Sequence, residues 1–191
     1  YWMHVGRLEL NGDKMSKSLG NVIYVKDLDS TTMGMIMRMV LVFTPYRNNF
    51  NYTAEVYSQY EKAFVKWQRA YKQGLYELQL KGVQSTDICE ADINQFIEYM
   101  NQDLNVQNVM MLIEQIVKEL NMAIRNKDIN TVSVKFNTLD KILNVLGINM
   151  FVKKMNEEQI EVYQKWNEAR ALKDFEKADI YRNMLVNWEI I

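Results

Sequence analysis

The chain of 191 residues contains one cysteine, one histidine, one proline and only seven glycines. The single cysteine, Cys89, excludes a disulfide framework within the chain and is expected to be a half-buried helix residue. Cys89 and His4 are too few to hold a zinc ion without acidic ligands. Because glycine and proline form most tight turns, their scarcity disfavours a fold of many short strands and favours long helices.

The net charge gives no global sign of nucleic-acid binding, and the hydropathy argues against a membrane protein. The net charge is −1, so any contact with a nucleic acid must come from local basic patches. No run of about 18 apolar residues occurs, and no membrane-spanning helix is therefore expected. The most apolar stretch, Met33–Thr44, is shorter and contains Arg38. A hydrophobic share of 48% is ample for a packed core.

The first part of the chain has a mixed pattern. Residues 1–10 alternate roughly between apolar and polar types, which indicates a short strand or hairpin arm before the turn signal Asn11-Gly12-Asp13. Residues 22–25 favour a short extended piece. A helix is then expected, with Thr31 or Thr32 as its N-cap, and the proline should end it.

Helical periodicity dominates the rest of the chain. Thr53 is expected to cap the longest helix, which ends near Lys81. Further helices are expected over about 87–100, 106–125 and 129–146, and as a pair over 156–188 that is broken near Asp174. The pattern predicts a mainly α fold, with a short α/β piece over residues 1–50 and an antiparallel helical bundle over 51–191.

The stretch GDKMSKSLGN, Gly12–Asn21, has the composition of a phosphate-binding loop. Lys14 and Lys17 are compact charges on flexible stems, which suit phosphate oxygens. Gly12 and Gly20 would let the backbone close over a ligand and reopen. A solvated polar hairpin tip has a similar composition, so the lysine spacing alone leaves both interpretations open.

The letters K-M-S-K-S, followed by L-G-N, resemble the signature loop of class I aminoacyl-tRNA synthetases. In that family the loop stabilises the pyrophosphate of ATP while the amino acid is adenylated. The resemblance assigns Lys17 most directly to ATP and catalysis, together with Lys14, while Met15, Ser16 and Ser18 shape the loop. The implied cofactor is ATP with magnesium.

Stretches on both sides of the loop are similar to cysteinyl-tRNA synthetases. W-M-H precedes the loop, and Arg38, Tyr46 and Arg47 match a helix with an arginine followed by H-Y-R-x-x-L-N-Y-S, although Pro45 replaces the histidine. Near the end, ARALKDFEKADIYRNML is similar to A-R-x-x-K-D-(W/F)-x-x-A-D-x-I-R-x-x-L. The resemblance is weak between residues 73 and 156.

The resemblance implies a surface that contacts tRNA(Cys). Arg38 and Arg47 are candidates, because arginine suits bidentate phosphate contacts, although each could instead bridge the two parts of the chain. Arg170 and Lys173 are further candidates, and a merely charged helix exterior is the alternative for both. Two ion pairs along a helix also fit the spacing, Arg170 with Asp174 and Asp179 with Arg182.

The resemblance also implies parts that this sequence does not contain. It has no H-I-G-H motif, and the Cys, His and Glu ligands of the family's zinc ion would precede this region. No metal site is expected in this chain, and His4 is expected to be a packing or hydrogen-bonding residue. We therefore expect the C-terminal half of a cytoplasmic, monomeric cysteine-tRNA ligase, inactive in forming cysteinyl-adenylate without its N-terminal half.

Three other functions remain to be compared with this one. A paralogous ligase would attach cysteine to an aminosugar, but the long helical region with A-R-x-x-K-D favours the tRNA enzyme. A stand-alone tRNA-binding helical module would carry the loop as a vestige. The ordered matches at both ends argue against a helical interaction protein with a chance motif.

Overall fold

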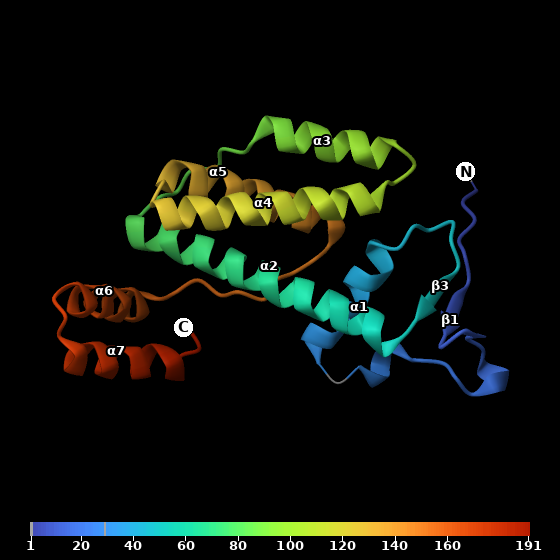
Figure 1. Ribbon diagram of the computed structural model, residues 1–191, viewed down its shortest axis with the longest axis horizontal. Helices are drawn as coiled ribbons and strands as arrows, with labels where there is room; N and C mark the ends of the chain where they lie inside the picture. The colour runs from blue at the N-terminus through green and yellow to red at the C-terminus, as the bar shows by residue number, and fades with distance from the viewer. Residues whose placement is uncertain (1, 29) are drawn as a thin grey trace.

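The protein is arranged along one long helix, α2 (Ala54–Lys81), in a computed structural model that describes residues 2–28 and 30–191 (Figure 1). A small sheet and α1 (Thr31–Val42) lie at the N-terminal end of α2 (Figure 1). The remaining helices are α3 (Glu90–Asn101), α4 (Val106–Asn126), α5 (Ile129–Leu146), α6 (Glu157–Ala171) and α7 (Phe175–Asn187). The mainly α fold with a short α/β piece is therefore confirmed.

The sheet has three short strands in the order β2-β1-β3. Strands β1 (Leu8–Leu10) and β2 (Asp13–Lys14) form an antiparallel hairpin, and β3 (Phe50–Tyr52) pairs in parallel with β1. The predicted arm is thus a strand only from Leu8 onward, and residue 1 lies outside the described residues.

The N–H groups of residues 6 and 7 donate to the loop that precedes β3, which explains the late start of β1. The Gly6 N–H donates to the Tyr46 carbonyl at 2.7 Å, and the Arg7 N–H donates to Asn49 Oδ1 at 2.9 Å. A Cβ at position 6 would lie 1.9 Å from the Asn48 carbonyl oxygen. Only glycine allows this close approach of the two backbones.

Two local predictions in this part differ from the structure. The piece expected to be extended over residues 22–25 still has extended backbone angles at Tyr24, but Val25 begins a short 3₁₀ helix, η2 (Val25–Asp27). The N-cap of α1 is Ser30, not Thr31 or Thr32, because Ser30 has extended backbone angles and its Oγ accepts from the Met33 N–H at 3.1 Å.

The bundle helices agree closely with the hydrophobic pattern. Thr53 caps α2 as predicted, with its Oγ1 accepting from the Val56 N–H at 3.3 Å, and α5 ends at Gly147. Helix α3 begins at Glu90, three residues later than expected, because side chains of α5 hold the preceding loop. The Cys89 N–H donates to Thr138 Oγ1 at 2.8 Å, so half-buried Cys89 is the N-cap and not a residue within the helix.

One hydrophobic core joins α1, α2, α4 and α5. Its fully buried side chains include Met39, Phe64, Trp67, Val109, Ile113, Ile116, Val117, Leu120, Leu139 and Ile142. Gly74 of α2 provides room for α4 and α5, since a Cβ there would lie 3.1 Å from the Phe136 ring and 3.4 Å from Leu120. Lys135 of α5 adds ion pairs to Asp92 of α3 at 2.7 Å and to Glu119 of α4 at 2.5 Å.

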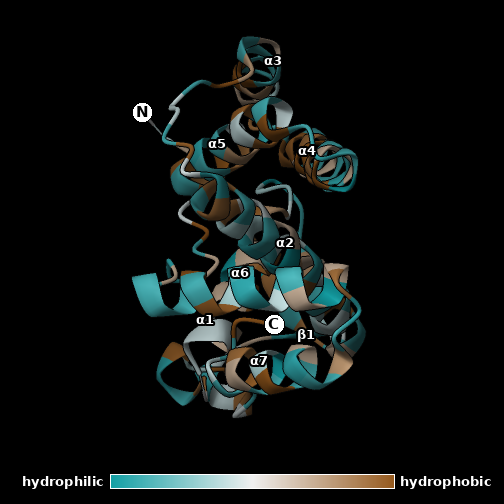
Figure 2. Cartoon of the chain, turned by 90° about the vertical axis from the view of Figure 1, so that its left-hand side faces the viewer, coloured by the Kyte–Doolittle hydropathy of each residue, from teal (hydrophilic) through white to brown (hydrophobic). Residues whose placement is uncertain are grey.

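Helices α6 and α7 form a separate hairpin beside α2 (Figure 1). Three α2 side chains donate to main-chain carbonyls of the flanking segments: Gln68 to Met150, Gln79 to Met155 and Lys72 to Glu189. Figure 2 shows mostly hydrophilic residues on the side of α6 that faces the viewer. Within residues 2–28 and 30–191, no helix combines the length and the apolar character needed to cross a membrane.

Ile116→Ala tests the position of the core. Ile116 is 0% exposed, and its truncation should lower the free energy of unfolding by about 2–5 kcal/mol, because a cavity is left in a close-packed interior. Met111→Ala is the matched control on the same helix, since Met111 is 70% exposed and should change stability little. Urea unfolding of both variants provides the comparison, and equal losses would contradict this packing.

Candidate functional site

The candidate site is the loop Lys14–Ser18, which leaves the sheet at the end of β2. The Met15 N–H still donates to the Leu8 carbonyl at 3.2 Å, which continues the hairpin beyond β2. Lys17–Leu19 then forms a 3₁₀ helix, η1, and Gly20 ends it with φ of 67°. The left-handed backbone at Gly20 turns the chain back toward the hairpin, so the loop is a closed structure and not a free tip.

Polar contacts hold the loop in this shape. Asn21 Oδ1 accepts from the Ser16 N–H at 2.9 Å, and Asn21 Nδ2 donates to the Lys14 carbonyl at 3.2 Å. The hydroxyls of Ser16 and Ser18 are 3.2 Å apart and share a hydrogen bond. These contacts use the backbone and the short side chains, and they leave the lysine ammonium groups out of the network.

The loop brings three cationic residues to one hollow. Lys14 and Lys17 are exposed and form no ion pair within the described ranges 2–28 and 30–191. They line a surface hollow of about 350 Å³ together with Arg7, Leu8, Met15, Ser16 and Val22. Sequence reasoning missed Arg7. The Asn11-Gly12 turn was the signal, because folding the hairpin there brings Arg7 back beside the loop.

Met15 connects the loop to the apolar interior of the N-terminal part. It lines a cavity of about 100 Å³ that is almost entirely apolar. The other lining residues are Leu8, Ile23, Val25, Leu28, Met37, Leu41, Phe50 and Tyr52. Met15 therefore lies between the sheet and α1, while the lysines on either side of it are exposed to solvent.

Arg38 connects α1 to the end of α5. Its Nε and Nη2 donate to the Leu146 carbonyl at 3.3 and 3.2 Å. A cation is favoured there, because the last carbonyls of a helix carry partial negative charge. Of the two alternatives for Arg38, the bridging contact is thus observed.

Arg47 also bridges the two parts of the chain. Its guanidinium donates to both carboxylate oxygens of Asp103, at 2.7 and 3.1 Å, and the Tyr46 hydroxyl donates to the same carboxylate at 2.6 Å. Asp103 lies between α3 and α4, where it and Leu104 both have positive φ, 55° and 56°. Non-glycine residues rarely adopt this conformation, and three hydrogen bonds to the Asp103 side chain hold the turn in place.

The two donors also change the acidity of Asp103. The hydrogen bonds from Arg47 first, and from Tyr46 second, lower the pKa of the Asp103 carboxyl from 3.8 to about 2. The carboxylate form is therefore the one that the folded protein stabilises.

Arg170 and Lys173 lie near the turn between α6 and α7, away from both bridges. The Arg170 guanidinium lies over the Trp166 ring, 4.7 Å from its centroid, and Lys173 has φ of 58° in the turn. The predicted pairs Arg170–Asp174 and Asp179–Arg182 do not form within the described residues. Helix α6 ends at Ala171, so Asp174 does not lie on the same helix as Arg170. Asp174 is instead the N-cap of α7 and pairs with Lys177 at 2.8 Å.

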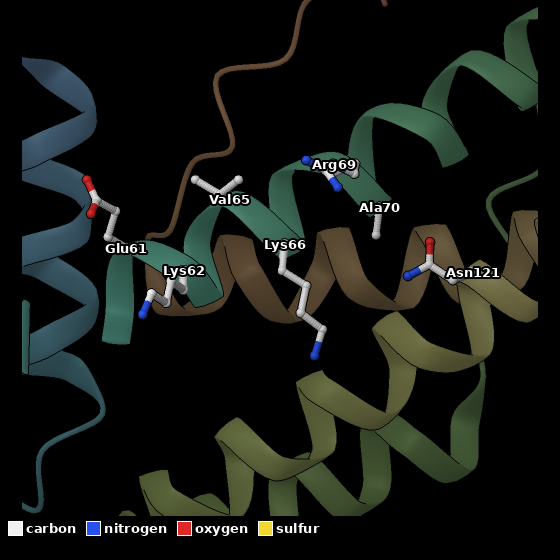
Figure 3. Close-up of a pocket in the computed structure, with 7 residues that line it drawn as sticks. All are labelled: Glu61, Lys62, Val65, Lys66, Arg69, Ala70 and Asn121. Carbon is white, nitrogen blue, oxygen red and sulfur yellow. The ribbon is translucent and has the colours of Figure 1, made fainter. Parts of the chain in front are cut away.

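A second basic hollow lies between α2 and α4 (Figure 3). Lys62, Lys66 and Arg69 of α2 line it at helical spacing together with Glu61, and Asn121 lies on the side of α4. Lys66 pairs with Glu114, which also accepts from Trp67 Nε1 at 2.8 Å.

Within residues 2–28 and 30–191, no three His, Cys, Asp or Glu side chains are grouped closely enough to hold a metal ion.

Two family models of known proteins match parts of this chain. The family model "tRNA synthetases class I (C) catalytic domain" matches residues 1–63, which include the sheet, the loop and α1. The family model "DALR domain" matches residues 95–151, from α3 to just beyond α5. The second match falls in the region where the residue-by-residue resemblance is weak.

The curated relatives share one activity in their names. A cysteine–tRNA ligase of Acholeplasma laidlawii is 35% identical over 98% of this chain and 42% of its own length. Enzymes of the same name from Mycoplasma mycoides subsp. mycoides and Ureaplasma parvum are 34% and 35% identical over 100% of this chain and 44% of theirs. The chain therefore spans less than half the length of these relatives.

Residues 1–63 are similar to the class I aminoacyl-tRNA synthetases, as the loop and the first family match show. Within that class the chain's relatives are cysteine–tRNA ligases. The order of the matches, catalytic domain first and DALR domain second, fits a C-terminal half of such an enzyme. The resemblance to the C-terminal half of cysteinyl-tRNA synthetases, inferred from the sequence, is confirmed.

Asp103→Asn should destabilise the protein in a pH-dependent way. Because the folded pKa of Asp103 is lowered to about 2, its carboxylate contributes stability above about pH 4, and this contribution is lost as the pH falls toward 2. The variant should therefore have a lower thermal midpoint at pH 7, and its difference from wild type should shrink below about pH 4. A difference that is constant down to pH 2 would contradict the assigned link.

Asp179→Asn is the control for this experiment. Asp179 is exposed on α7 and forms no hydrogen bond or ion pair within the described residues. Its variant should follow the wild-type midpoint at every pH.

Proposed function

We propose that the chain is the C-terminal half of a cysteine–tRNA ligase, which activates cysteine with ATP as cysteinyl-adenylate and transfers it to tRNA(Cys). The observation that carries this proposal is the folded loop Lys14–Ser18, whose two lysines stand at one hollow beside a matched helical domain. The names of the relatives support the same activity. No observation favours an aminosugar acceptor or a stand-alone binding module.

In this proposal the loop supplies positive charge to the phosphates of ATP. Adenylation releases pyrophosphate, and charge builds up on its oxygens in the transition state. Within residues 2–28 and 30–191 the ammonium groups of Lys17 and Lys14 form no ion pair, so they can follow these oxygens as the bond breaks. Met15, Ser16 and Ser18 hold the loop in shape.

The proposal also includes two kinds of metal ion, magnesium and zinc. Magnesium would accompany the phosphates of ATP, as it usually does when a protein binds a nucleotide. The zinc ion that the resemblance implies would be bound by the N-terminal half, since its Cys, His and Glu ligands are not in this sequence.

We divide the chain functionally near residue 50. Residues 1–50 would form the end of the catalytic domain with its ATP loop, and residues 51–191 the bundle on the anticodon side of the tRNA. Arg38, Arg47, Arg170 and Lys173 are the proposed tRNA contacts, of which Arg170 and Lys173 are not engaged in a bridge between the parts. We further propose a cytoplasmic, monomeric enzyme.

Lys17→Ala in the full-length enzyme should slow ATP–pyrophosphate exchange by orders of magnitude. The substitution removes a charge that acts mainly in the transition state, so kcat should fall more than the affinity for ATP. Lys26→Ala is the control, because Lys26 is an exposed lysine of η2 that does not line the loop's hollow. Near-normal exchange by Lys17→Ala would refute the assignment of this loop to ATP.

Arg47→Ala should weaken tRNA charging more than it weakens ATP–pyrophosphate exchange. Asp103→Asn separates the two roles of Arg47, because it breaks the bridge but leaves the guanidinium free to bind a phosphate. If Arg47 contacts tRNA, the Asp103 variant should charge tRNA better than the Arg47 variant. Equal loss of both activities in both variants would show that Arg47 acts only through folding.

A further inference from the structure

Asn21 makes the two contacts that close the loop carrying both lysines. Its Oδ1 accepts from the Ser16 N–H at 2.9 Å, and its Nδ2 donates to the Lys14 carbonyl at 3.2 Å. The two bonds lie on either side of Met15, which faces the apolar cavity. One half-buried side chain therefore fixes the backbone from residue 14 to residue 16.

Few other side chains could do the same. A side-chain amide has an acceptor and a donor on two atoms bonded to the same carbon, and here it meets one N–H and one carbonyl. Aspartate could accept from Ser16, but its second oxygen would face the Lys14 carbonyl without a hydrogen between them. The left-handed backbone of Gly20 places residue 21 opposite the loop, so the two residues act together.

We propose that Asn21 is a positioning residue of the adenylation reaction, an inference that rests on the proposed function. Asn21 does not reach the hollow itself, which is lined by Arg7, Lys14, Lys17 and four other residues. It sets the direction in which the chain leaves residue 14 and enters η1 at Lys17. The positions of both ammonium groups over the phosphates follow from that direction.

The positioning of the lysines by Asn21 should affect the transition state more than the binding of ATP. Flexible lysines still reach a bound triphosphate when the loop is loosened, so ground-state affinity changes little. Optimal placement at the moment of bond breaking is lost, and misplacement of a catalytic group by about 1 Å can cost about 100-fold in rate.

Asn21→Ala in the full-length enzyme tests the inference by ATP–pyrophosphate exchange. We expect kcat to fall about 10- to 100-fold while KM for ATP changes less than about threefold. Asn21→Asp, which keeps the size of the side chain and the acceptor for Ser16, should also lose at least about tenfold in kcat. It keeps the test decisive if the alanine variant does not fold. A raised KM with unchanged kcat, in whichever variant folds, would overturn the proposal.

Asn51→Ala is the matched control for a merely structural role. Asn51 also bonds its side chain to a backbone group of the hairpin, accepting from the Gly12 N–H at 2.8 Å, but it does not contact the loop. Its kcat should stay within about threefold of wild type, and losses equal to those of Asn21→Ala would overturn the proposal. Lys17→Ala, measured in parallel, distinguishes failure of the proposed function from failure of the role of Asn21. Normal exchange by the Lys17 variant refutes the proposed function. A slow Lys17 variant beside a normal Asn21 variant refutes only this inference.

Discussion

The parallel pairing of β1 with β3 fixes the position of the loop relative to the rest of the structure. This pairing attaches the hairpin that carries the loop to the segment that begins α2, and α2 then supports the whole bundle. The same segment provides Tyr46 and Arg47, which bind Asp103 of the α3–α4 connection. Through these contacts the position of the loop is tied to the helical bundle by short, directional hydrogen bonds.

Most helices were predictable because their information is local. Apolar spacing and the caps at Thr53 and Gly147 determine α2 and α5 within the helices themselves. The errors occur where a distant contact decides the outcome. Helix α3 starts late because Thr138 binds the Cys89 N–H, and β1 starts late because Gly6 bonds to the Tyr46 carbonyl. Neither partner can be identified from the residues nearby.

The residues of the candidate site also fall into those that the local sequence predicts and those that depend on distant contacts. The letters of the loop pointed directly to Lys14 and Lys17, since the motif itself carries the chemistry. Arg7 and Asn21 required the hairpin and the turn at Gly20, which bring them to the loop in space. The bridges of Arg38 and Arg47 were open to two interpretations, because Leu146 and Asp103 lie 108 and 56 residues away along the chain.

The way in which the α6–α7 hairpin is attached to α2 determines which of its positions tolerate substitution. Gln68, Lys72 and Gln79 all donate to main-chain carbonyls, at Met150, Glu189 and Met155. Every residue type offers such an acceptor, so substitutions at these three acceptor positions leave the donors with the same partner. The outer face of the hairpin can therefore vary, while these three donors and the buried Leu185 of α7 keep its attachment to the rest of the protein.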